Sequence, residues 1–262
     1  MQTYLDKIIS DHRELAGSDT RKTSDLISIA RDMPPCLGFK KSLEGAGVSI
    51  IAEIKRRSPS RGALNADLDP VAQAKTYELN GASCISVLTD EKYFAGSLEY
   101  LRLVKNSTRV PILRKDFTVC ENDVLDARVN GADAILLIVS ALSQQELVEL
   151  QGLARDVGLD VLVEVHDESE LDRAKLVGAD LVGVNQRDLY TFEVDSNKAL
   201  VMAELFEPEA VKVCESGISS PTQISALAKA GYNAALVGET LVRSMDPGRT
   251  LSELLRAGRG DF

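Results

Sequence analysis

The stretch VSIIAEIKR at residues 48–56 joins a short apolar run to charged residues at its carboxyl end. Its apolar residues do not alternate with polar ones, which is typical of a strand buried on both faces. Seven similar runs follow at near-constant spacing, each succeeded by a helical pattern: CISVLT (84–89), VPILRKD (110–116), AILLIVS (134–140), DVLVEVH (160–166), LVGVNQR (181–187), AVKVCESG (210–217) and AALVGE (234–239). Eight such units predict an α/β protein, a single (β/α)8 TIM barrel with an N-terminal helical extension.

Charged and polar residues gather at the carboxyl ends of these predicted strands. In a parallel barrel those ends meet at one mouth, where such barrels carry out chemistry. The side chains expected there are Glu53, Lys55, Lys115, Asp116, Glu164, Asn185, Arg187, Glu215 and Ser216. Because burying many ionisable groups is costly unless they pair or react, this cluster is the predicted active site.

Length and composition limit the remaining possibilities. A chain of 262 residues fits one barrel, so we expect an extension at 1–47 and a catalytic barrel at 48–262. A formal charge of −10 argues against a nucleic-acid surface. The chain lacks both a membrane-length apolar run and a signal-peptide core, which favours a cytoplasmic protein with no membrane partner. We expect a monomer.

The cysteines and histidines give no sign of a metal or a cofactor. The four cysteines are predicted to be free thiols in a reducing compartment, because they form no CxxC pair: Cys36, Cys84, Cys120 and Cys214. His12 and His166 are the only histidines and lie far apart in the sequence. We therefore expect no transition-metal site and no cofactor.

Two segments outside the predicted strands bear on the site. Residues 1–47 carry helical apolar spacing and are expected to pack on the barrel and cover one end. The stretch RSPSRGALNADLDP (57–70) has no periodicity, and long barrel loops of this composition are often mobile lids.

Small-residue turns after the seventh and eighth predicted strands indicate a phosphate site. CESGIS (214–219) and VGETL (237–241) stand where barrels commonly bind phosphate through backbone N–H groups. Gly217 and Gly238 let the backbone approach an anion, although both can also serve only as tight turns. The carboxylate of Glu239 is expected to point away from the phosphate.

Lysine and glutamate side chains make up the reactive part of the predicted mouth. Glu53 and Lys55 lie two residues apart and therefore on the same face of the first strand. Lys115 and Glu164 come from the third and fifth strands. Lysine and glutamate sharing a desolvated pocket shift each other's pKa and can act as general acid and base; the alternative is a structural ion-pair ring.

The motifs together resemble those of the indole-3-glycerol phosphate synthase family. The matching segments span nearly the whole chain, in order: EIKRRSPSRG (53–62), YFAGSLEYL (93–101), LRKDF (113–117), LVEVH (162–166), GVNQRDL (183–189), CESGI (214–218) and LVGE (236–239). The resemblance implies a carboxy-lyase of tryptophan biosynthesis that needs no cofactor. Its implied substrate is 1-(2-carboxyphenylamino)-1-deoxyribulose 5-phosphate, a phosphorylated small molecule whose indole ring is closed with loss of carbon dioxide and water.

The resemblance also implies roles for individual residues. Lys115 and Glu164 match the family's acid and base, and Lys55 matches the lysine that contacts substrate and shares the acid role. The polar residues that position them are Glu53, Asn185 and Glu215. The implied substrate-binding residues are Ser58, Phe94, Phe117, Leu136, Arg187, Ser216, Gly217, Gly238 and Glu239, with Phe94, Phe117 and Leu136 forming an apolar slot. Many family members have a small residue in place of Glu239.

Three other functions remain open at this point. One is phosphoribosylanthranilate isomerase, although a Cys and Asp acid–base pair cannot be placed at the mouth. Another is a Schiff-base aldolase using Lys55 or Lys115, which borohydride trapping would expose. The third is a non-catalytic barrel that binds a phosphorylated ligand, against which the charged mouth argues.

Overall fold

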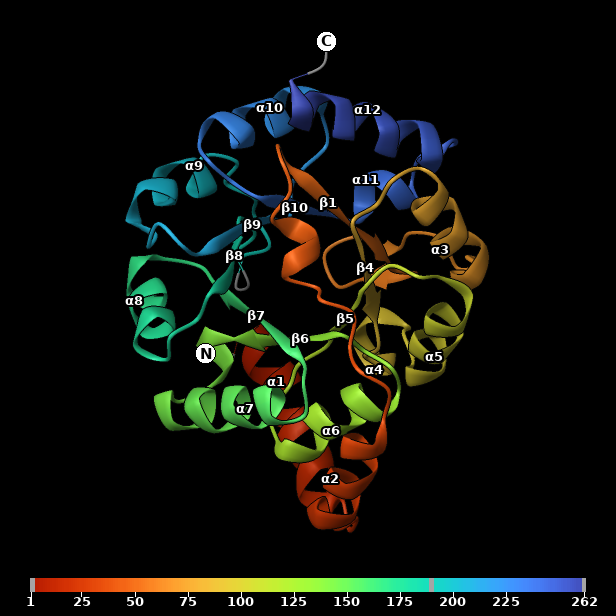
Figure 1. The fold of residues 1–262 in the computed structure, drawn as a ribbon, viewed down its shortest axis with the longest axis vertical. Helices are drawn as coiled ribbons and strands as arrows, with labels where there is room; N and C mark the ends of the chain where they lie inside the picture. The colour runs from red at the N-terminus through yellow and green to blue at the C-terminus, as the bar shows by residue number, and fades with distance from the viewer. Residues whose placement is uncertain (1–2, 189–190, 261–262) are drawn as a thin grey trace.

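The computed structural model describes residues 3–188 and 191–260, and eight parallel strands within them close into a barrel. Each strand pairs with its neighbours in chain order, and the last pairs with the first (Figure 1). The barrel strands are β1 (Ser49–Ile54), β4 (Cys84–Leu88), β5 (Ile112–Lys115), β6 (Ala134–Ile138), β7 (Asp160–Val165), β8 (Leu181–Asn185), β9 (Val211–Glu215) and β10 (Ala234–Val237). The predicted TIM barrel is confirmed.

Side chains of each barrel strand alternate between two apolar cores. In β1, Ile50 and Ala52 pack toward the surrounding helices, whereas Ile51 belongs to the barrel interior. Both groups are fully buried. This two-sided burial explains the unbroken apolar runs in the sequence, since neither face of a strand meets water.

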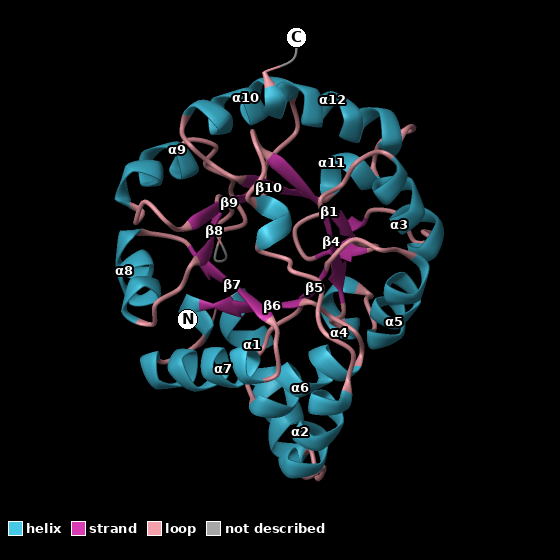
Figure 2. Cartoon of the chain, viewed as in Figure 1, coloured by secondary structure: helices cyan, strands magenta, loops and turns pink. Residues whose placement is uncertain are grey.

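Helices surround the strands on the outside of the barrel (Figure 2). Their bounds are α1 (Tyr4–Ser18), α2 (Thr23–Asp32), α3 (Pro70–Leu79), α4 (Glu91–Phe94), α5 (Leu98–Ser107), α6 (Glu121–Val129), α7 (Gln144–Asp156), α8 (Glu168–Leu176), α9 (Lys198–Met202), α10 (Pro221–Lys229), α11 (Glu239–Val242) and α12 (Pro247–Arg259). Asp167 and Ser220 cap α8 and α10, as their sequences indicate. None of the helices in the described ranges is long and apolar enough to cross a membrane.

The N-terminal extension contacts both ends of the barrel, whereas the sequence indicated only one. Leu5 and Ile8 of α1 line the cavity at the carboxyl ends of the strands. Phe39 and the 3-10 helix η1 (Lys41–Leu43) close the opposite end, where Phe39 and Leu43 join the interior core and are fully buried. Burying each of these two side chains contributes about 1.5–3 kcal/mol, so the extension is part of the fold.

The connection after β1 contains regular structure that the sequence did not indicate. Strands β2 (Arg57–Ser58) and β3 (Gly62–Ala63) pair antiparallel, with Arg57 opposite Ala63. Arg56 anchors the base of this hairpin by donating two hydrogen bonds to the Leu68 carbonyl, at 3.0 and 2.6 Å. The loop is therefore a short hairpin beside the mouth. Two further 3-10 turns, η2 (Val139–Ala141) and η3 (Ala203–Leu205), complete the described elements.

Candidate active site

A cavity of about 590 Å³ lies at the carboxyl ends of the barrel strands. Nearly all of the site residues indicated by the sequence line it: Glu53, Lys55, Ser58, Phe94, Lys115, Phe117, Glu164, Asn185, Arg187, Glu215, Ser216, Gly217, Gly238 and Glu239. They come from strand ends far apart in the chain, which the closed barrel brings together. Leu189, the last residue of the GVNQRDL motif, lies outside the described residues.

Two expected site residues, Leu136 and Asp116, do not line the cavity. Asp116 points away from it and pairs with Arg114 and His12. Leu136 lies below the cavity. It is 1% exposed and packs in the barrel interior. Residues two apart on a strand point the same way, so β6 presents Ile138 at the level of Glu164, one layer above Leu136. The sequence pattern predicts which side chains of β6 point into the barrel. It does not predict how far along the strand the packed interior extends before the cavity begins.

The side chains of Lys115 and Glu164 face each other inside the mouth. Lys115 Nζ lies 3.4 Å from Glu164 Oε2 and 3.8 Å from Glu215 Oε2. Asn185 Nδ2 donates to Glu164 Oε1 at 3.0 Å. The two carboxylates are 1% and 2% exposed, so the lysine ammonium and the asparagine amide replace the water they have lost.

The charges in this group set the protonation states. Burial opposes the charge of Lys115, but Glu164, Glu215 and Glu53 prevail and raise the pKa of its ammonium. Burial likewise opposes the charge of Glu164, yet Lys115 and His166 leave its pKa below the usual value. Burial and the neighbouring Glu164 raise the pKa of Glu215 well above its ordinary range. The resting site thus holds a charged lysine between an ionised carboxylate and a carboxyl group that favours its neutral form.

Two glycines create the space for the buried carboxylates. A Cβ atom at Gly183 would lie 2.1 Å from Glu215 Oε1, and one at Gly238 would lie 2.3 Å from Glu53 Oε1. Glu53 in turn pairs with Lys55. Gly183 was not among the expected site residues, because only the packed barrel shows which carboxylate lies against a given backbone position.

The turn after β9 has a strained backbone next to the cavity. Ser216 has φ of 68° and Gly217 has φ of 73°, and the left-handed region is uncommon for a residue with a side chain. Gln186 Nε2 donates to the Ser216 carbonyl at 2.9 Å, and Gln223 Nε2 donates to the Gly217 carbonyl at 3.2 Å. These two glutamines hold the turn in place, and neither was among the expected site residues.

Glu239 lies at the same side of the cavity, surrounded by arginines. Its carboxylate is 3.2 Å from Arg61 Nε, 3.4 Å from Arg243 Nη1 and 3.9 Å from Arg187 Nη2. Glu239 thus lines the cavity and pairs there with arginines, and its expected orientation away from a bound phosphate stays a prediction. The arginines give an otherwise acidic chain a local positive site.

Apolar side chains line part of the same cavity. The rings of Phe94 and Phe117 lie 6.2 Å apart between centroids, and α1 adds Leu5 and Ile8 to the same cavity. The extension was expected to pack on the barrel and cover one end, but the sequence did not indicate that residues of α1 line this cavity. The cavity therefore has an apolar side, an acid–base centre and a cationic side.

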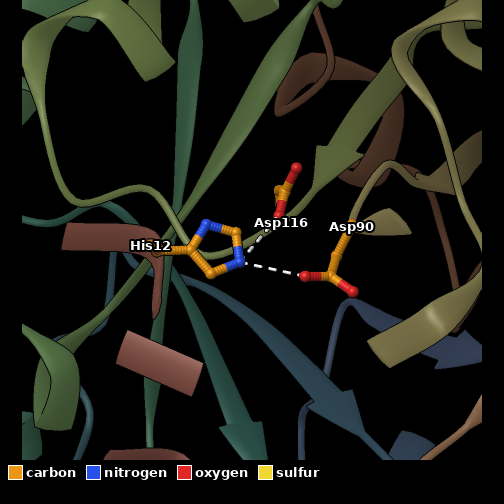
Figure 3. Close-up of side chains that lie close together, drawn as sticks. All are labelled: His12, Asp90 and Asp116. Carbon is orange, nitrogen blue, oxygen red and sulfur yellow. Dashed lines mark hydrogen bonds and ion pairs between the residues drawn. The ribbon is translucent and has the colours of Figure 1, made fainter. Parts of the chain in front are cut away.

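A second cluster fastens α1 to the barrel (Figure 3). His12 Nε2 lies 2.9 Å from Asp90 Oδ2 and 3.9 Å from Asp116 Oδ1. Asp90 also caps α4, and Asp116 also accepts hydrogen bonds from Arg114, Thr89 and the Phe117 backbone. A cation bound here would have to displace these donors, so we interpret the cluster as an ion-paired attachment of α1. Burial lowers the pKa of His12, but Asp90 and Asp116 outweigh it and raise that pKa.

The fold and the cavity define a TIM-barrel enzyme with a lysine–carboxylate acid–base centre. Comparison with known proteins gives the family. Residues 5–254 match the family model described as indole-3-glycerol phosphate synthase. The chain belongs to the indole-3-glycerol phosphate synthase family and is a carboxy-lyase of tryptophan biosynthesis, acting on a phosphorylated small molecule.

Individual relatives agree with this assignment over their full length. Indole-3-glycerol phosphate synthase of Koribacter versatilis is 45% identical over 260 residues, covering 97% of this chain and 100% of the relative. The protein of the same name from Kineococcus radiotolerans is 46% identical over 263 residues, covering 98% and 96%.

Solved structures at low identity share only the fold. Thiamine phosphate pyrophosphorylase from Pyrococcus furiosus superimposes with a TM-score of 0.63 at 16% identity, over 85% of this chain and 98% of that one. The 3-hexulose-6-phosphate synthase from Salmonella typhimurium gives 0.66 at 12% identity, over 82% and 100%. Both support the barrel architecture.

Proposed function

We propose that the cavity binds 1-(2-carboxyphenylamino)-1-deoxyribulose 5-phosphate and converts it to indole-3-glycerol phosphate, carbon dioxide and water. The observation that carries this proposal is the buried pairing of Lys115 with Glu164 at 3.4 Å, because the reaction needs an acid and a base within reach of one substrate. The substrate has an aromatic end, a reacting centre and a phosphate, which correspond in order to the three sides of the cavity.

In the first step, the ring carbon bearing the carboxylate attacks the ribulose carbonyl carbon. A carbon–carbon bond forms, and the carbonyl oxygen takes a proton from a lysine ammonium as negative charge builds on it. Loss of carbon dioxide then returns the bond electrons to the ring and restores aromaticity. Lys115 and Lys55 are the two lysines available, and each is paired with a carboxylate.

In the last step, the new hydroxyl leaves as water and a proton departs from the adjacent ring CH2 carbon, which forms the double bond of the indole. One lysine protonates the leaving hydroxyl, and Glu164 takes the proton. Asn185 holds the Glu164 carboxylate by its hydrogen bond, while Glu53 and Glu215 position the two lysines. A lysine held as an ammonium between two glutamates is poorly suited to act as an amine nucleophile, which disfavours the Schiff-base aldolase alternative.

The phosphate end of the substrate is assigned to the turns after β9 and β10. Ser216, Gly217 and Gly238 bring backbone N–H groups to the cavity, and the N–H of Glu239 follows. Arg187, Arg61 and Arg243 add positive charge beside them. Glu239 pairs with these arginines, so an arriving phosphate competes with its carboxylate for them.

The apolar end of the substrate is assigned to Phe94 and Phe117, with Ser58 on the hairpin that borders the cavity. Ile138 takes the position on β6 that was expected for Leu136. The β2–β3 hairpin closes over bound substrate as a lid, carrying Ser58 and Arg61 toward it.

The remaining assignments concern the whole chain. We divide it into an extension at 1–47 and a catalytic barrel at 48–262, acting as a monomer without a cofactor, membrane or nucleic-acid partner. The thiols of Cys36, Cys84, Cys120 and Cys214 are free, which supports a cytoplasmic location.

The test of this proposal is the Glu164→Gln variant. Glutamine keeps the shape of Glu164 and its contact with Asn185 but cannot accept the proton. We expect kcat to fall by roughly two to four orders of magnitude with KM changed by less than about threefold. Indole fluorescence of the product reports the rate on a low background, because the chain has no Trp. A loss of less than tenfold would remove Glu164 from the role of base.

A further inference from the structure

His166 lies directly behind the base and has no part in the mechanism above. It follows β7, and its Nε2 atom is shut off from solvent without a hydrogen-bond partner. That atom lies 3.4 Å from Glu164 Oε1, the oxygen that also accepts from Asn185. A buried, unpartnered imidazole nitrogen beside a catalytic carboxylate is costly unless the pair serves a purpose.

The other side of the ring settles which nitrogen carries a proton. Glu170 Oε2 lies 3.0 Å from His166 Nδ1 and also accepts from the His166 backbone N–H at 2.8 Å. A carboxylate can only accept, so Nδ1 is the protonated nitrogen of a neutral ring. Nε2 would then turn a lone pair toward the negative Glu164 oxygen. A second proton, on Nε2, converts this repulsion into an ion pair.

The charges around His166 favour that second proton. Glu164 on β7, Glu170 on α8 and Asp167 at the start of α8 are negative, and Lys198 on α9 is the opposing cation. Burial lowers the pKa of the imidazole, but the two glutamates outweigh burial and Lys198 and raise it. Asn185, from β8, adds no charge.

This arrangement matters when Lys115 gives up its proton. In the resting site Lys115 is the ammonium paired with Glu164. Once it has protonated the substrate, a carboxylate that is 1% exposed would be left without that countercharge, which favours protonation of Glu164, and a protonated carboxyl group cannot accept the substrate proton. A cation on the far side of Glu164 prevents this.

We propose that His166 is a positioning residue for Glu164: as an imidazolium held by Glu170, it supplies a second positive charge that keeps Glu164 ionised and oriented while Lys115 acts as acid. This inference rests on the proposed function, in which Glu164 is the base. His166 does not touch the reacting atoms in this scheme.

The test combines three variants with the pH dependence of kcat. In Glu170→Gln the imidazolium loses its partner, and we expect the alkaline limb of the kcat profile to move down by about one pH unit. In His166→Gln the positive charge is absent at every pH, so we expect kcat to fall by roughly 10- to 100-fold while KM changes by less than about threefold. Adding Glu170→Gln to His166→Gln should not shift the alkaline limb of the kcat profile any further. The matched control is Glu168→Gln, which removes the same charge from an exposed position on α8 and leaves the profile unchanged.

A direct measurement accompanies the kinetics. The chain has two histidines, so ¹⁵N spectra of histidine-labelled protein are assigned by one His12→Asn variant. We expect His166 to be an imidazolium at pH 7 and to lose its proton at lower pH in Glu164→Gln. A neutral His166 at pH 7, or a kcat profile unmoved by Glu170→Gln, overturns the inference. Those results leave the role of Glu164 standing if Glu164→Gln is inactive, whereas an active Glu164→Gln enzyme removes Glu164 from the role of base on which this inference rests.

Discussion

Replacing Gly183 with alanine tests whether the placement of Glu215 controls catalysis. The added Cβ would lie 2.1 Å from Glu215 Oε1, so this carboxyl group must retreat by about 1.3 Å to reach an ordinary contact at 3.4 Å. It can do so by moving toward the cavity, which limits the loss of stability to about 1–2 kcal/mol, or a few degrees in Tm. Glu215 lies 3.8 Å from Lys115, and a 1 Å misplacement at a reacting centre can cost about 100-fold in rate.

The assay measures kcat by indole fluorescence and Tm by thermal unfolding in parallel. We expect a loss of kcat near 100-fold beside a small drop in Tm. Gly152→Ala is the matched control, because a Cβ there meets no atom within 4 Å and alanine favours the helix. Adding Glu215→Asp shortens the displaced side chain and should restore Tm but not kcat. Full activity in Gly183→Ala would show that the position of Glu215 is immaterial and refute the reasoning.

Two further predictions concern the cationic side of the cavity and the attachment of α1. In Glu239→Gln the arginines lose their internal carboxylate, so inorganic phosphate should inhibit roughly three- to tenfold more strongly in steady-state assays; weaker inhibition would contradict the competition we infer. The raised pKa of His12 makes its ion pair with Asp90 stabilising below the unfolded pKa of about 6.5, and this contribution is lost as pH rises through the folded pKa. The hydrogen-exchange rate of the α1 amides should therefore rise with pH more steeply than the intrinsic exchange rate. In His12→Asn this additional rise should be absent. The same pH dependence in the wild-type protein and in His12→Asn would exclude the attachment.

Much of the acid–base centre follows from position along the chain. Glu53, Lys115, Glu164 and Glu215 each stand at the carboxyl end of an apolar run, and a parallel barrel brings such ends to one mouth. The eight runs are recognisable because strands buried on both faces need continuous apolar sequence. The positive-φ glycines after the helices, such as Gly81 and Gly131, are likewise local features that the sequence indicates.

Other features depend on contacts between distant segments. Leu136 and Ile138 share one face of β6, and only the height of the packed interior decides which of them meets the cavity. Glu239 pairs with Arg61 from a hairpin about 180 residues earlier in the chain, a distance over which sequence spacing carries no geometric information.

The sequence by itself determined the barrel, the strand ends and the residue types at the mouth, because these follow from hydrophobic periodicity and the geometry of parallel strands. Only the tertiary structure decided that α1 and Phe39 close opposite ends, that Gly183 makes room for Glu215, and that His166 lies behind Glu164. These relations arise from close packing between elements, and packing is fixed by the distances at which side chains from separate elements meet.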